Sequence, residues 1–145
     1  MVSVQEILRS KGSQVYSIGP AESVYRAIEE MTACNAGALV VLDDEQLVGI
    51  VTERDYLRKI ALKGRRSQET QVKEIMSSPV VTVSAEDSLA QCLATMTEQH
   101  CRHLPVMGDE GLAGLVSIGD LVKAVVREKE VEIHELQGFI QGRYG

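Results

Sequence analysis

The sequence predicts an α/β (α+β) fold in which one β-α-β-β-α unit occurs twice and the two copies pack as one module. Three observations support this prediction. The chain has 145 residues and is 44% hydrophobic, which is enough for a single shared core. Its apolar residues alternate between strand-like and helix-like spacing. Residues 15–60 also align without a gap to residues 80–125, and 12 of the 46 positions are identical, where average composition gives roughly three.

The first copy provides each element in order. A β-branched run at 15–18 predicts a strand, and apolar residues at helical spacing over 20–31 predict a helix that Pro20 opens. Apolar runs at 38–42 and 47–51, separated by the acidic turn DDEQ, predict a β-hairpin. Tyr56, Leu57, Ile60 and Ala61 predict the apolar face of a closing helix.

The second copy repeats this order. A strand is expected at 80–83, a helix over 89–96, a hairpin from the runs at 104–107 and 112–116, and a closing helix whose apolar face carries Leu121, Val122 and Val125. The acidic turn of this hairpin is GDEG. The two copies therefore predict the same local structure from related but different residues.

Segments outside the copies complete the chain. Related helical leads, VQEIL at 4–8 and VKEIM at 72–76, precede the two copies, and the polar stretch 63–71 reads as a linker. Residues 127–142 predict a short closing helix that packs on this chain or on a second subunit. The predicted division is a first repeat with its lead, a second repeat, and a C-terminal helix or tail, at residues 1–66, 67–128 and 129–145.

Composition excludes several classes of function. The formal net charge of -6 disfavours nucleic acid as a partner, because phosphate backbones are held by clustered Lys and Arg. Three cysteines without a CxxC spacing fit reduced thiols and a cytoplasmic location better than a disulfide framework. The first residues lack the apolar region of a signal peptide, and no stretch approaches the ~18 apolar residues of a membrane helix, so no membrane association is expected.

The most informative strings are GIVTERD at 49–55 and GLVSIGD at 114–120. In each string, the end of a strand is followed by a residue with a hydroxyl group, Thr52 or Ser117. An aspartate, Asp55 or Asp120, comes three positions later in the first helical turn. Helix capping alone explains one such pattern. The recurrence behind a matching glycine favours a binding role as well, because a carboxylate accepts hydrogen bonds from both hydroxyls of a ribose, and helix-start amides can meet a phosphate.

A repeated β-α-β-β-α unit that ends in this pattern resembles a tandem pair of CBS domains, named after cystathionine beta-synthase. The segment HCRHLPV at 100–106 is similar to one common in stand-alone bacterial members. The resemblance implies a pseudo-twofold pair of repeats with two clefts between them, a homodimer, and an adenosine-containing ligand. That ligand is AMP as first guess, with ADP, ATP, NAD(H) or S-adenosylmethionine as alternatives. The implied ribose-binding residues are Thr52, Asp55, Ser117 and Asp120.

Cations for the phosphate are expected beside these carboxylates, and the candidates are Arg54, Arg102 and His103. A solvent-exposed helix face is an equally good explanation for Arg54. The resemblance places adenine against the first strand and the start of the hairpin, where the candidates are Ser17, Ile18, Ala38, Thr82 and Val83. Ordinary core or strand packing explains each of these five residues equally well.

These features fit three functions to different degrees. The favoured one is a regulatory nucleotide-binding module that changes its packing with a second subunit or with a separate protein partner. The alternative is a ligand-free dimerisation or scaffold module. An enzyme is disfavoured, because the sequence lacks GxGxxG, a nucleophile elbow and HExxH. A metal site is also disfavoured, because His100, Cys101 and His103 run from a helix end into a strand and should diverge.

Overall fold

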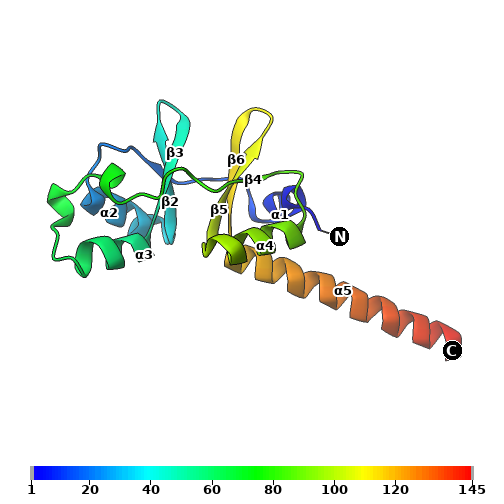
Figure 1. Ribbon diagram of the computed structural model, residues 1–145. Coiled ribbons are helices and arrows are strands. Elements are labelled where there is room, and N and C mark those ends of the chain that lie inside the picture. Colours follow the sequence, from blue (N-terminus) through cyan, green and yellow to red (C-terminus); the bar gives the residue numbers. More distant parts are fainter. Residues whose placement is uncertain (1, 145) are drawn as a thin grey trace. The chain divides into compact units, whose positions relative to one another are not determined.

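The computed structural model describes the backbone of residues 2–144 and the side chains of residues 2–140. The chain forms two compact units (Figure 1). Residues 14–81 form the first-repeat unit. The second-repeat unit combines residues from 82 onward with the N-terminal segment up to Ser13. Each unit has its own cluster of buried apolar side chains.

The first-repeat unit contains a three-stranded sheet in the order β1-β2-β3, with β1 parallel to β2 and β2 antiparallel to β3. The side chains of α2 that face the core, such as Val24, Ala27 and Met31, follow helical spacing. The elements of this unit are β1 (Ser17–Ile18), α2 (Val24–Cys34), β2 (Ala38–Asp43), β3 (Gln46–Thr52), α3 (Glu53–Tyr56), the π-helix η1 (Leu57–Ala61), and the 3₁₀ turns η2 (Ser67–Glu69) and η3 (Val72–Glu74).

The second-repeat unit has the same sheet, in the order β4-β5-β6 and with the same strand directions. Its elements are α1 (Val4–Lys11), β4 (Val83–Ser84), α4 (Leu89–Gln99), β5 (His103–Gly108), β6 (Gly111–Ser117) and α5 (Ile118–Tyr144). The repeated β-α-β-β-α order is therefore confirmed. No helix within residues 2–144 combines the length and the apolar character that a membrane crossing requires.

Each helical lead packs on the other repeat. The amide of Val4 in the first lead donates to the carbonyl of Asp87 at 2.9 Å, and the amide of Val72 in the second lead donates to the carbonyl of Glu22 at 2.8 Å. Val4 and Val72 are both fully buried. The repeat boundaries read from the sequence, 1–66 and 67–128, thus differ from the units that pack together, because the buried face of each lead belongs to the other core.

The matching glycines of the two hairpins are explained by these leads. A Cβ atom on Gly49 would clash with Sδ of Met76, and one on Gly114 would lie 2.7 Å from Cδ2 of Leu8. Leu8 and Met76 occupy equivalent positions in the two leads. Glycine is therefore needed because a lead side chain covers the strand at that point.

Two sequence predictions need correction. The stretch 63–71 is not a linker between the units: Thr70 in this stretch is buried, and its carbonyl accepts from the amide of Val24 at 2.8 Å. The apolar face predicted for the first closing helix is also wrong in part, because Ile60 is buried whereas Leu57 and Ala61 are exposed. The π-helical turn at 57–61 changes which side chains face the core.

Smaller differences concern the second copy. The predicted strand at 80–83 begins only at Val83. The C-terminal segment is not a separate short helix, because α5 runs without a break for 27 residues from the end of β6. Figure 1 shows α5 continuing well beyond the sheet of its own unit.

Candidate functional site

Both repeated motifs form capping boxes. In the first-repeat unit, Oδ2 of Asp55 accepts from the amide of Thr52 at 2.9 Å, and the amide of Asp55 donates to Oγ1 of Thr52 at 3.2 Å. In the second-repeat unit, Oδ2 of Asp120 accepts from the amide of Ser117 at 2.8 Å, and the amide of Asp120 donates to Oγ of Ser117 at 3.2 Å. These reciprocal bonds fix each carboxylate at the step from strand to helix.

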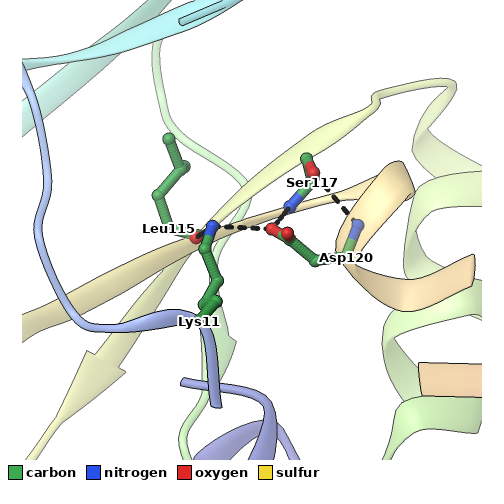
Figure 2. A network of polar contacts seen from close by, with 4 residues as sticks. All are labelled: Lys11, Leu115, Ser117 and Asp120. Atoms are coloured by element: carbon green, nitrogen blue, oxygen red, sulfur yellow. Dashed lines mark hydrogen bonds and ion pairs between the residues drawn. The ribbon is translucent and has the colours of Figure 1, made fainter. Parts of the chain in front are cut away.

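A lysine contacts each carboxylate, but the two lysines come from different elements. Nζ of Lys11, at the end of α1, lies 2.6 Å from Oδ2 of Asp120 and donates to the carbonyl of Leu115 at 2.8 Å (Figure 2). Nζ of Lys59 lies 3.2 Å from Oδ1 of Asp55, one helical turn away, and donates to the carbonyl of Ile75 at 2.7 Å. Both carboxylates are therefore paired with a cation from their own unit.

The environment of Asp120 keeps its carboxyl group ionised. Burial alone would raise the pKa of this carboxyl, but the hydrogen bond and the charge of Lys11, together with the Ser117 amide, lower the pKa below its ordinary value. Only 16% of the Asp120 side chain is exposed. An ionised carboxylate is purely a hydrogen-bond acceptor, so this group suits a ligand that presents hydroxyls.

Asp120 also lines a pocket of about 510 Å³ within the second-repeat unit. Three cationic side chains line the same pocket, Lys11 from α1 and Lys123 and Arg127 from α5. The guanidinium of Arg127 donates to Oγ of Ser10 at 2.7 Å. This pocket therefore places an ionised carboxylate near positive charge, the combination that a phosphorylated sugar requires.

A second pocket, of about 390 Å³, lies in the first-repeat unit between α2 and α3. Most of its lining side chains are apolar, including Ile28, Met31, Tyr56 and Leu57. Its chemistry differs from that of the pocket at Asp120, because the lining residues include no lysine or arginine.

The three predicted phosphate-binding residues all lie within or beside a carboxylate motif, but their side chains are placed differently. His103 is the cross-strand partner of Ser117, as Ala38 is of Thr52 in the other unit. Arg102 is exposed just before β5, and its carbonyl accepts from the amide of Ile118 at 2.8 Å. Arg54 is exposed on α3. Position 103 is therefore joined to the Ser117–Asp120 motif through the β-ladder, whereas the side chains of the two arginines are exposed to solvent.

The five predicted adenine-binding residues divide into two groups. The side chains of Ile18, Ala38 and Val83 are buried in their own units, so they can offer a ligand little beyond backbone groups. Ser17 and Thr82 are exposed beside the first strand of each repeat. The packing explanation therefore accounts for three of the five residues.

Sequence reasoning missed both lysines. Lys59 follows Asp55 by four positions on a helix, a spacing that signals an ion pair and could have been read. Lys11 lies 109 positions from Asp120, and no local pattern connects them. Lys123 and Arg127 were also missed, although their spacing of four places them on one face of α5.

The cysteines are free thiols, as the sequence predicts. Burial, with the charge of Asp87, raises the pKa of Cys92 to about 11, and burial also raises the pKa values of Cys34 and Cys101. Raised values make a thiol a poor nucleophile at neutral pH. Within the described part of the chain, no three His, Cys, Asp or Glu side chains gather as metal ligands would.

Comparison with known proteins identifies the repeated unit. The family model for the CBS domain matches residues 3–62 and 72–127. The chain is 40% identical to the mitochondrial CBS domain-containing protein CBSX3 of Arabidopsis thaliana, over 98% of this chain and 73% of that protein. Among solved structures, the CBS domain NE2398 is 47% identical with a TM-score of 0.82, over 86% of this chain and 98% of that chain. A protein with CBS domains from Burkholderia ambifaria is 44% identical with a TM-score of 0.83, over 87% and 95%.

Proposed function

Because the chain belongs to the CBS domain family, whose members are generally regulatory modules that bind adenosine-containing ligands, we propose that it is a regulatory adenine-nucleotide-binding module. AMP is the first candidate ligand, and ADP, ATP, NAD(H) and S-adenosylmethionine share its adenosine. Asp120 with Ser117, and Asp55 with Thr52, accept or donate hydrogen bonds at the ribose. The protein performs no catalysis itself, acts in the cytoplasm and forms a homodimer.

The observation that carries this proposal is the ionised carboxylate of Asp120 on the wall of a cation-lined pocket. The two hydroxyls of a ribose can both donate to one carboxylate, and charge-assisted hydrogen bonds of this kind are about twice as strong as neutral ones. Lys123 and Arg127 lie within the same pocket and supply positive charge for a phosphate. His103 adds a further donor through its place opposite Ser117.

The contact between Lys11 and Asp120 suggests how binding is sensed. A ribose that donates to Asp120 competes with Lys11 for the same carboxylate oxygen, and the released ammonium can turn to the phosphate of the same ligand. The C-terminal end of α1 is then tied to the ligand instead of to Asp120. A ligand shifts such an equilibrium only by its different affinity for the two arrangements.

The test measures binding of AMP, ADP, ATP, NAD, NADH and S-adenosylmethionine to the full chain by isothermal titration calorimetry. Asp120→Asn and Asp55→Asn keep the size of the side chain and remove the charge. Asp109→Asn and Asp44→Asn are matched controls, because they make the same change at equivalent positions in the two hairpin turns. We expect Asp120→Asn to weaken binding at least tenfold, since a hydrogen bond to a charged group contributes about 1.5–3 kcal/mol.

The results separate the candidate functions. If the control variants Asp109→Asn and Asp44→Asn bind a compound with wild-type affinity and Asp120→Asn binds it more weakly, the proposal is supported and that compound is the ligand. Binding that is unchanged in both carboxylate variants would show that the ribose is held elsewhere. If none of the six compounds binds, the regulatory proposal fails, and the ligand-free scaffold becomes the better account.

A further inference from the structure

The outer part of α5 carries an exposed apolar stripe. Every residue from 129 to 140 is exposed, so this part of the helix has no packing partner within the described chain. An isolated helix of this length is marginally stable in water, and helices are normally stabilised by burying an apolar face. The family model ends at residue 127, so most of this stripe lies outside the CBS domains.

The spacing of the stripe is that of a coiled-coil seam. The series runs through residues 122, 126, 129, 133, 136 and 140, so successive members are alternately four and three positions apart. All of these residues are apolar except Lys129. This average period of 3.5 residues is the heptad pattern, with positions a and d turned toward a partner helix. The seam consists of Val126, Ile133 and Ile140 at position a and Val122, Lys129 and Leu136 at position d, and its five apolar members are 47–62% exposed.

We infer that this seam pairs with the same seam of a second copy of the chain, as a parallel two-stranded coiled coil. The seam extends over 18 residue steps, or about 27 Å of helix. β-branched residues at a with leucine at d favour two strands in parallel. Position a is β-branched throughout, and the apolar d position in the outer part of the helix is Leu136.

Charges beside the seam favour a parallel pair over an antiparallel one. The flanking positions are Lys123, Glu130 and Gln137 at e, and Val125, Glu132 and Phe139 at g. In a parallel pair, g of one helix meets the next e of the other, so Val125 meets Glu130 and Glu132 meets Gln137. In an antiparallel pair with full overlap, Lys123 meets Gln137 and Val125 meets Phe139, but Glu130 meets Glu130 and Glu132 meets Glu132, and these like charges repel.

Lys129 is the one charged residue in the seam. Its Nζ lies 3.3 Å from Oε2 of Glu132 on the same helix, so its charge is already partly balanced. A single lysine within an apolar seam lowers stability but fixes the register of the two helices. The pair is therefore expected to be specific and of moderate affinity.

This inference gives a surface to the proposed homodimer and does not depend on nucleotide binding. The test compares Ile133→Glu with Val131→Glu by sedimentation equilibrium of the full chain over a range of concentrations. Ile133 and Val131 are both β-branched and both 55% exposed, but only Ile133 lies in the seam. We expect the wild type and Val131→Glu to be dimers, and the dissociation constant of Ile133→Glu to rise at least tenfold.

The outcomes distinguish this inference from the proposed function. If Ile133→Glu dimerises as well as the wild type, the seam is not the interface, although a homodimer exists. If the wild type is a monomer at all concentrations, both the seam and the homodimer are wrong, while nucleotide binding is still measured separately.

Disulfide trapping tests the parallel orientation. Leu136→Cys places two thiols face to face in a parallel pair, whereas in an antiparallel pair residue 136 faces residue 126. Mild oxidation should therefore give a crosslinked dimer for Leu136→Cys well above the level of the wild type, and no such increase for Val131→Cys. Absence of a crosslink in Leu136→Cys would overturn the parallel arrangement.

Discussion

The two carboxylate motifs have the same local structure and different surroundings. Asp55 and Asp120 sit in matching capping boxes, yet Asp55 is paired with a lysine of its own helical segment and Asp120 with a lysine from the N-terminal helix. The capping box is local and was copied with the repeat. The lysine that contacts Asp120 comes from the N-terminal helix α1, whereas Lys59 comes from η1 of the first repeat, so the duplication produced two motifs but not two equal sites.

The difference begins where the two leads diverge. After the 3₁₀ turn η3, the backbone of the second lead pairs with the first hairpin, and the amide of Ser77 donates to the carbonyl of Ile50 at 2.9 Å. The equivalent carbonyl in the other unit, that of Leu115, accepts from Nζ of Lys11 instead. A helix of eight residues places a side chain where the shorter lead places backbone, and only the side chain can carry charge to the aspartate.

Truncating a buried isoleucine in each lead should have the largest effect on stability. Ile7→Ala and Ile75→Ala change equivalent residues that are 6% and 1% exposed, and each should cost about 2–5 kcal/mol of stability. Amide hydrogen exchange measured by mass spectrometry should show lost protection in α4, β5 and β6 for Ile7→Ala, and in α2, β2 and β3 for Ile75→Ala. The opposite assignment would mean that each lead packs on its own repeat.

A double-mutant cycle on each ion pair should give a smaller effect. The Lys11 and Lys59 side chains are 33% and 43% exposed, so water screens both pairs. We expect a coupling of up to about 1 kcal/mol between Lys11 and Asp120, and about 0.3–0.5 kcal/mol between Lys59 and Asp55. The variants are Lys→Met and Asp→Asn, and urea denaturation gives the free energies. Equal couplings would remove the distinction between the two sites.

The pH dependence of stability should show the smallest difference. The pKa of Asp120 is lower in the folded state than its ordinary value of about 3.9, so the ionised group stabilises the fold above that pH. This contribution, under about 1 kcal/mol for a partly exposed pair, is lost as the pH falls through the folded pKa. The stability gap between wild type and Lys11→Met should therefore shrink below about pH 4. A gap that is constant from pH 6 to pH 3 would contradict the ion pair.

Much of the fold could be predicted from local patterns. The hairpins β2-β3 and β5-β6, the helices α2 and α4, and the capping residues Thr52 and Ser117 were all indicated by spacing over a few positions. Local patterns fail for two elements whose structure depends on packing. The polar composition of 63–71 favours a linker although Thr70 is buried, and the exposure of Leu57 follows from a π-helical turn that the apolar spacing does not signal.

The sequence by itself determined the duplication, the order of strands and helices in each copy, and the two aspartates that follow a strand, because these features depend on residues close together along the chain. Only the tertiary structure decided that each lead crosses to the other repeat, that Lys11 reaches Asp120, and that Lys123 and Arg127 share its pocket. The physical reason is that those contacts join residues far apart in sequence. Their formation depends on which apolar face buries most completely, and local periodicity carries no information about that partner.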